Sequence, residues 1–398
     1  MAKKLRKIKQ KIQKLMENKD TKVLERIEKN IEMLKNRTCT MFFFVADSKN
    51  IPNAKMEYIY EMANTLHVNG YKVCMLYQLE NEYTEKELNE LKQKEMPLDE
   101  NRMFVGVREW LGDKYADLPH LNISLGTWNV SPCDFLFIPE VFAGLMKEVH
   151  KNQIPCMRIG ILQNPRHITE FIPLGDQWGS YGVYEAIVPS KKTADFVTSV
   201  FKYVKPTVIN PCIHEFFRKP IKAKKLIVDV VCKHKVDAEH VIKMFYWKYP
   251  MYQFVPLRYL VDFKREKYAE MLQESAFTIW LDYETSFGMN ALEAIRCGNV
   301  VIGKIPETIP EWMEDGEDLK SNGIWVDTLN DVPEALAVSI NKWLEDGVSD
   351  VMQKEMDATS EKYTLSEWNG NVNKMAETFI NKRIKFFEDC KKPFIEEK

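Results

Sequence analysis

Short, largely apolar runs alternate with helix-like segments along most of this 398-residue chain. Two of the clearest are Cys39–Ala46 (CTMFFFVA) and Leu226–Cys232 (LIVDVVC), and each is followed by a segment whose apolar residues have helical spacing. Strands that are apolar on both faces are typical of parallel sheets covered by helices on both sides. The alternation therefore restricts the chain to the doubly wound α/β class of folds.

The alternation occurs in two successive series, which meet near Arg218-Lys219-Pro220, where the apolar periodicity lapses. A chain of this length is too long for one ordinary core, so two Rossmann-like domains are expected. We place the first domain at residues 39–218 and the second at residues 219–347, and we expect residues 348–398 to be helical.

The two series define the predicted elements. The first predicts a helix over Met56–Val68 and strands at Cys39–Ala46, Tyr71–Tyr77, Phe135–Ile138, Cys156–Ile161, Ala186–Pro189 and Thr207–Ile209. The second predicts helices over Ala238–Tyr249 and Arg265–Glu274 and strands at Leu226–Cys232, Tyr252–Leu257, Phe277–Leu281, Asn299–Gly303 and Gly323–Val326. In the helical tail, the candidates for the buried face are Trp368, Met375, Phe379, Ile384 and Phe387.

Residues 282–312 (DYETSFGMNALEAIRCGNVVIGKIPETIPEW) combine a strand end, a glycine turn, a short helix and a further strand. Phe287-Gly288 directly precedes the predicted helix, so backbone N–H groups at the helix start converge on one point and suit an anion such as a diphosphate. Glu293 lies about one and a half turns into that helix, where a carboxylate can reach the hydroxyls of a ribose. The run therefore predicts a nucleotide site.

Residues 1–38 form a separate basic extension. Residues 1–15 carry seven Lys or Arg and no acid, with Leu5, Ile8, Ile12 and Leu15 at helical spacing, and a second amphipathic helix is expected before residue 38. Such a helical hairpin can dock on the body of the protein or pair with another copy through residues 1–36. Alternatively, it is a basic arm that contacts anionic lipid or nucleic acid.

Composition excludes several classes of protein. The chain has no apolar run of the length that a transmembrane helix needs and no apolar stretch typical of a secretory signal, so we expect a cytoplasmic protein, either free or peripheral at a membrane. The eight cysteines lack paired spacing, which indicates reduced thiols and no zinc site. A net charge of −2 argues against general nucleic-acid binding by the whole molecule.

Three segments resemble GT-B glycosyltransferases, and within them the large retaining family that includes glycogen synthases (glycosyltransferase group 1). Residues 284–298 (ETSFGMNALEAIRCG) resemble the signature of that family, E-G-F-G-x-x-x-x-E-A-x-x-x-G. Residues 209–217 (INPCIHEFF) resemble its hinge segment, and residues 52–73, which end in ANTLHVNGYKV, resemble its first strand–helix unit. Together the resemblance spans roughly residues 39–345.

The resemblance implies an acceptor site in the first domain, a nucleotide-sugar donor site in the second, and chemistry in the cleft between them. It further implies that residues 348–398 pack back on the first domain. The donor residues implied are Glu293 for the ribose, backbone N–H groups around Phe287, Gly288, Met289 and Asn290 for the sugar and phosphates, and Lys233 and Lys235 for the leaving diphosphate. The lysines would supply the positive charge that departure of a diphosphate requires, so no metal or other cofactor is expected.

The chain departs from the family pattern at three places. The first signature carboxylate is replaced by Thr285, and the acid Glu284 stands one residue earlier, where it remains a catalytic candidate that could still reach the sugar. No arginine and lysine pair at the family spacing follows Leu226–Cys232, and the glycine-rich loop of the first domain is replaced by residues 52–55 (PNAK). His167, after a strand of the first domain, is a second catalytic candidate that could steady the acceptor.

Simpler explanations exist for each of these residues. Glu293 could be a solvated helix carboxylate, Phe287 and Met289 could be core residues, and His167 could be a loop histidine without a role. Lys233 and Lys235 could be exposed lysines.

Three function classes remain open. The first is a hexosyltransferase that takes the sugar from a nucleoside-diphosphate donor and retains its configuration. The second is a relative that binds nucleotide or sugar without catalysis. The third is an enzyme with a nucleic-acid acceptor, of the viral type that glycosylates modified bases. The sequence leaves open whether the acceptor is a glycan, a lipid-linked sugar or a nucleic acid.

Overall fold

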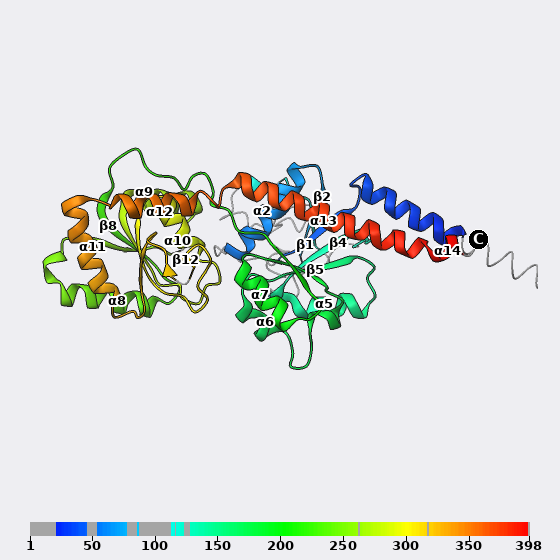
Figure 1. Cartoon of the computed structure of the whole chain (residues 1–398), viewed down its shortest axis with the longest axis horizontal. Helices are drawn as coiled ribbons and strands as arrows, with labels where there is room; N and C mark the ends of the chain where they lie inside the picture. Colours follow the sequence, from blue (N-terminus) through cyan, green and yellow to red (C-terminus); the bar gives the residue numbers. More distant parts are fainter. Residues whose placement is uncertain are drawn as a thin grey trace, which may run out of the picture.

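The computed structural model describes residues 21–45, 54–77, 86, 113–115, 117–122, 128–261, 263–316 and 318–396. In this part of the chain, two sheets of parallel strands lie side by side along the long axis, and each is covered by helices (Figure 1). This arrangement is the pair of Rossmann-like doubly wound domains that the sequence predicts.

The first sheet has seven parallel strands in the order β3-β2-β1-β4-β5-β6-β7. Alternate residues of β1 pack in two different cores, Met41 and Phe43 on one face and Phe42 and Phe44 on the other. Both faces of the sheet are therefore buried, as the continuous apolar run requires. The strands are β1 (Thr40–Phe44), β2 (Lys72–Tyr77), β3 (His120–Asn122), β4 (Phe135–Pro139), β5 (Met157–Ile161), β6 (Glu185–Val188) and β7 (Lys205–Val208), and the main helices are α2 (Ala54–Val68), α5 (Ala143–Lys151), α6 (Pro165–Phe171) and α7 (Lys191–Val200).

The second sheet has five strands in the order β14-β11-β10-β8-β9. Its central strand β10 is buried along its whole length, with Trp280 in the core on one face and Phe277 in the core on the other. The strands are β8 (Lys225–Val231), β9 (Leu257–Tyr259), β10 (Ser275–Trp280), β11 (Val300–Lys304) and β14 (Ile324–Val326), and the helices are α8 (Lys235–Lys248), α9 (Arg265–Glu274), α10 (Met289–Arg296), α11 (Val332–Asp346) and α12 (Asp350–Ser360).

Two element predictions were wrong. The strand expected at Tyr252–Leu257 is instead a 3₁₀ helix at Pro250–Tyr252, and the strand of this region is β9, which begins after Pro256. Proline has no N–H for a sheet, so the two prolines confine the strand to the residues that follow them. The three-residue edge strand β3 was missed because so short a segment has no periodic pattern.

The last long helix, α13 (Leu365–Lys391), crosses from the second domain to the first and packs against α2 (Figure 1). The Trp368 indole Nε1 donates to Thr65 Oγ1 at 2.9 Å, and the Trp368 ring meets Tyr58 edge-on. The other predicted tail residues are buried as well, except Ile384, which packs at the margin of the same core. The chain thus ends on the domain in which it began.

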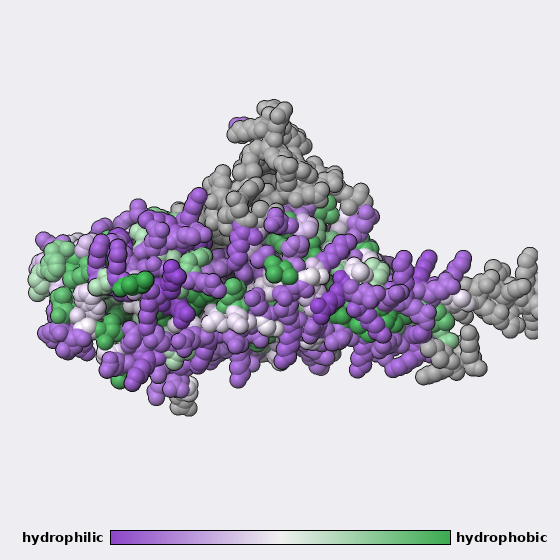
Figure 2. Space-filling model, turned by 90° about the horizontal axis from the view of Figure 1, so that it is seen from above, coloured by the Kyte–Doolittle hydropathy of each residue, from purple (hydrophilic) through white to green (hydrophobic). Residues whose placement is uncertain are grey.

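Residues 21–35 form a helix that runs beside α13, and Lys391 Nζ lies 2.6 Å from Glu28 Oε1 (Figure 1). The first helix of the expected hairpin, with its basic residues, lies outside the described residues, so its proposed contacts stay predictions. None of the described helices combines the length and apolar character that a membrane span needs. The face in Figure 2 is mostly hydrophilic, with hydrophobic side chains in several separate areas.

Candidate active site

A cleft with about 740 Å³ of space, part of it open to solvent, lies between the two domains. The strands of each sheet are parallel, so their carboxyl ends lie at one edge, and the loops that follow these ends supply most of the lining. From the first domain come Lys55, Tyr58, Gln163, Asn164, Pro189 and Pro211, and from the second come Lys233, Trp280, Asp282, Thr285, Ser286, Phe287, Gly288, Met289 and Asn290.

The turn before α10 forms the second-domain wall of the cleft. Gly288 is the N-cap of α10 and has φ = 76°, a left-handed conformation that favours glycine. A Cβ atom on Gly288 would also lie 2.8 Å from Cζ2 of Trp280, so a side chain does not fit there. The Trp312 indole donates to the Phe287 carbonyl oxygen at 2.6 Å and fixes the turn. The four residues predicted to surround the donor phosphates, Phe287, Gly288, Met289 and Asn290, all line the cleft.

The two predicted phosphate lysines differ in position. Lys233 lines the cleft, and its backbone N–H donates to Asp282 Oδ1 at 2.8 Å. Lys235 is the first residue of α8, has a side chain that is 74% exposed, and pairs with Glu239 on the same helix at 3.6 Å. The structure therefore brings Lys233 to the cleft and leaves Lys235 on the helix surface, because the helix begins three residues earlier than the sequence pattern indicated.

Glu284 lies beside the cleft rather than on its wall. Its carboxylate pairs with Arg166 of α6 at 2.9 Å and with His234 at 3.6 Å. Partial desolvation raises the pKa of Glu284, but the charge of Arg166 and the contacts with His234 outweigh it and hold the pKa below its usual range. Thr285, not Glu284, lines the cleft. In this arrangement the carboxylate is paired with partners from both domains, and the expectation that Glu284 reaches the sugar stays a prediction.

His167 contacts the cleft through Lys55. The Lys55 Nζ atom lies 2.6 Å from His167 Nδ1, and Glu140 Oε1 is 3.9 Å from each of these two nitrogen atoms. Burial and the neighbouring Lys55 charge lower the pKa of His167, so the ring is neutral near pH 7. His167 is therefore placed to orient Lys55 rather than to line the cleft itself.

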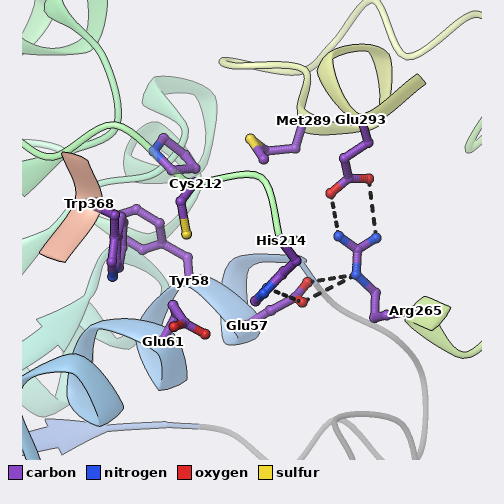
Figure 3. Close-up of a pocket in the computed structure, with 10 residues that line it drawn as sticks. Glu57, Tyr58, Glu61, Cys212, His214, Arg265, Met289, Glu293 and Trp368 are labelled. Atoms are coloured by element: carbon purple, nitrogen blue, oxygen red, sulfur yellow. Dashed lines mark hydrogen bonds and ion pairs between the residues drawn. The ribbon is translucent and has the colours of Figure 1, made fainter. Parts of the chain in front are cut away.

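Glu293 is 1% exposed and lies on the second turn of α10. Both of its carboxylate oxygens accept hydrogen bonds from the guanidinium of Arg265, the first residue of α9 (Figure 3). The same guanidinium contacts Glu57 of α2 at 3.1 Å, and Glu57 in turn lies 2.9 Å from His214 Nε2. A row of charged groups thus joins the second domain to the first.

The electrostatics of this row follow from burial and pairing. Burial raises the pKa of Glu293, and Arg265 opposes that rise. Burial also acts to raise the pKa of Glu57, but Arg265 and His214 together outweigh it and lower that pKa to about 2. The row borders a second cavity with about 350 Å³ of space, part of it open to solvent, which shares Tyr58, Pro211 and Met289 with the cleft. Glu293 therefore faces a space that adjoins the cleft.

Residues 259–363, which include the turn, α10 and Glu293, match the family model of glycosyl transferases group 1. The chain contains a glycosyltransferase group 1 domain. A relative, the α-1,6-glucosyltransferase of Actinobacillus pleuropneumoniae serotype 7 (strain AP76), is 24% identical in sequence to this chain over 197 aligned residues. That match covers 46% of this chain and 60% of the relative.

Solved structures similar to the chain are GT-B glycosyltransferases, and this protein has their fold. The sucrose-phosphate synthase of Thermosynechococcus elongatus superimposes with a TM-score of 0.57 and 10% identity, over 86% of this chain and 98% of that one. A pneumococcal O-GlcNAc transferase in complex with UDP and GlcNAc superimposes with a TM-score of 0.55 and 10% identity, over 85% of this chain and 99% of that one. An α-glucosyltransferase in complex with UDP and a 13-mer DNA superimposes with a TM-score of 0.52 and 12% identity, over 86% of this chain and 99% of that one.

The glycosyltransferase group 1 domain and its partner domain also bring together residues that the sequence pattern did not single out. Lys55 of the first domain lines the cleft. Glu57 of the first domain and Arg265 of the second line the adjoining cavity. One signal was present for Lys55, since it stands at the start of a helix that follows a buried strand, where active-site residues of such folds gather. In the described part of the chain, no group of three or more His, Cys, Asp or Glu side chains is arranged to hold a metal ion.

Proposed function

We propose that this protein transfers a hexose from a nucleoside-diphosphate sugar to an acceptor, with retention of configuration at the anomeric carbon. The observation that carries the proposal is the cleft itself, in which the start of α10 and Lys233 face Lys55 of the other domain. A helix start and two lysines together suit a dianionic diphosphate held between two domains.

The donor would bind along the second-domain wall. The first N–H groups of a helix lack partners within it, so those at Met289 and Asn290 are suited to bind phosphate oxygens. The ribose would lie toward the cavity beside Glu293, whose carboxylate can accept hydrogen bonds from two hydroxyls. The hexose would then extend from the diphosphate toward Thr285 and the first-domain wall.

Charge stabilisation is the chemistry that such a site can supply. As the bond between the anomeric carbon and the diphosphate oxygen breaks, negative charge grows on the diphosphate, and Lys233, Lys55 and the start of α10 would stabilise it. The acceptor hydroxyl would attack from the same face as the leaving group, and the departing phosphate oxygen would take its proton. In this scheme the reaction needs no metal ion and no protein base, and both absences are part of the proposal.

The test combines donor binding with turnover. We expect one class of nucleoside diphosphate to raise the thermal unfolding midpoint of the full chain, since a ligand at 100 times its Kd stabilises by about 2.7 kcal/mol. We expect the wild type to hydrolyse or transfer the sugar slowly, and Glu293→Ala to lose turnover. Absence of stabilisation by any nucleoside diphosphate at millimolar concentration would contradict donor binding, and binding without turnover would favour a relative that binds but does not catalyse.

The identity of the acceptor is a separate part of the proposal. One relative is named an α-1,6-glucosyltransferase, which favours a sugar acceptor, and one solved structure of this fold holds DNA. A nucleic-acid acceptor predicts that affinity falls steeply with salt, because released counterions drive such binding. Acceptor affinity that is insensitive both to salt and to deletion of residues 1–36 would eliminate that alternative.

A further inference from the structure

Arg265 contacts two buried carboxylates that line the cavity beside the cleft, one from each domain. It is the first residue of α9 in the second domain, and its side chain is 16% exposed. Its guanidinium donates to both oxygens of Glu293 within the second domain and to Glu57 of the first domain (Figure 3). The rings of Phe217 and Tyr268 flank it at 4.9 and 5.8 Å. The planar fork is therefore held in one orientation by partners on all sides.

The contact with Glu57 reaches the cleft through α2. Glu57 and Lys55 both belong to the first turn of that helix, and only Lys55 lines the cleft. A helix moves as a rigid unit over so short a distance, so a bond that fixes Glu57 also fixes the start of the Lys55 side chain. Side-chain contacts thus run from Glu293 through Arg265 to Glu57, and the backbone of α2 links Glu57 to Lys55.

We propose that Arg265 is a positioning residue that aligns the two halves of the donor site. It orients the Glu293 carboxylate for the ribose, and through Glu57 it places the Lys55 amino group for the diphosphate. This inference rests on the proposed function, because it assigns the two ends of one nucleoside diphosphate to the two ends of the contact chain. It implies that the ribose half and the diphosphate half of the donor are recognised as a unit.

The alternative is that the row of charges only holds the two domains together. A purely structural contact would lower the stability of the protein when broken, but it would weaken all nucleotides equally. If Glu57 instead positions Lys55 through the backbone of α2, loss of the Arg265–Glu57 bond weakens a ligand in proportion to the phosphate groups that Lys55 reaches. The two cases therefore differ in the ratio of affinities for a nucleoside diphosphate and for the matching nucleoside.

Glu57→Gln in the full chain is the decisive variant, because it loosens the Glu57 end of the row and leaves the pairing of Arg265 with Glu293. We expect it to lower the affinity for the nucleoside diphosphate by about tenfold and to leave the affinity for the nucleoside unchanged, as measured by titration calorimetry. In a Lys55→Met background, Glu57→Gln should cost no further affinity for the diphosphate, because the group that it positions is gone.

The matched control is Glu61→Gln. Glu61 lies one turn further along α2, is also buried and lines the same cavity, but its partners are Lys114 and Tyr115 of the first domain and it does not contact Arg265. If Glu61→Gln and Glu57→Gln change the diphosphate-to-nucleoside ratio alike, or if the effects of Glu57→Gln and Lys55→Met add, the inference is wrong. Arg265→Lys, which keeps the charge without the fork, should weaken both ligands, and thermal unfolding checks that each variant is folded. A wild type that binds no nucleoside diphosphate would instead refute the proposed function.

Discussion

The two ends of the second sheet hold the same chemistry in different settings. Near the amino ends of its strands, Arg258 pairs with the fully buried Asp229 at 2.8 Å and with Glu274 at 2.7 Å. Close by, Lys224 Nζ contacts Asn299 Oδ1 at 2.5 Å and the carbonyl oxygens of two further residues. Every one of these partners belongs to the second domain.

At the carboxyl ends, three charged groups are bound to the other domain or face the cleft. Arg265 bonds to Glu57, Glu284 to Arg166, and Lys233 lines the cleft. Both ends contain buried arginine–carboxylate pairs, so the presence of such a pair does not identify a functional site. What distinguishes the carboxyl ends is that their partners come from elements far apart in the chain and border a cavity.

Arg258→Met tests most directly whether the charged cluster at the amino ends of the strands contributes to stability alone. We expect this change to leave the Asp229 carboxylate buried without its cation and to lower the free energy of unfolding by about 3–5 kcal/mol. Nucleoside-diphosphate affinity of the folded protein should be unchanged. Chemical denaturation measures the first quantity and calorimetry the second. A loss of affinity without a loss of stability would show that the amino ends of the strands also belong to the site.

Whether a contact at either end of the sheet can be predicted from the sequence depends on how far apart its two residues lie along the chain. The strands and the turn at Gly288 follow from local patterns, since a continuous apolar run and a glycine before an amphipathic segment need no other part of the chain. The direction of Glu284 does not, because Arg166 of the other domain decides it.

The same holds for Arg265. Its partner Glu57 is 208 positions away, so no spacing along the sequence brings the two together. The position of Lys235 outside the cleft has a more local reason, because the exact start of α8 decides whether a side chain points into the cleft or along the helix. The fold and the glycine turn before α10 were therefore predictable, and the contacts between the domains were not.

Gly288→Ala tests whether the backbone conformation of the turn before α10, at the carboxyl ends of the strands, is required for stability and nucleotide binding. We expect a loss of about 1–3 kcal/mol in the free energy of unfolding, because the new Cβ meets Trp280 and a left-handed φ is imposed on alanine. Nucleotide affinity should fall as well, since the start of α10 must shift. Gly316→Ala is the control, because Gly316 has φ = 68° but open space around its Cβ position. Equal effects at both positions would mean that φ alone, not the close fit against Trp280, constrains the turn.

Lys233→Met and Lys235→Met form a pair that separates the cleft from the helix surface. Loss of a charge-assisted contact with phosphate should lower nucleoside-diphosphate affinity by about 10-fold or more for Lys233→Met. Lys235→Met should leave it within about twofold, because its side chain pairs with Glu239 in solvent. Titration calorimetry on both variants provides the measurement. Equal losses would place both lysines at the donor and overturn the assignment drawn from the start of α8.

Lys224 gives the smallest effect, and it appears only as a dependence on pH. Burial lowers the pKa of Lys224 from 10.5 to about 8 in the folded protein. Between these two values the unfolded chain holds a proton that the folded protein has released, so the contribution of Lys224 to stability rises with pH. Relative to Lys224→Met, the wild type should gain about 1–2 kcal/mol between pH 8 and pH 10, a figure reduced because the side chain is only partly buried.

The difference between the two proteins is the quantity to measure, by urea unfolding at several pH values. The wild-type curve alone is not informative, since burial raises the pKa of thiols such as Cys156, in the first domain, to about 11 and those groups destabilise the fold as the pH rises. They are present in both proteins, so their contribution cancels to first order. A difference that stays flat across this range would mean that Lys224 keeps its proton in the fold. The amino ends would then hold a fully charged cluster, and only the identity of its partners would distinguish it from the row around Arg265.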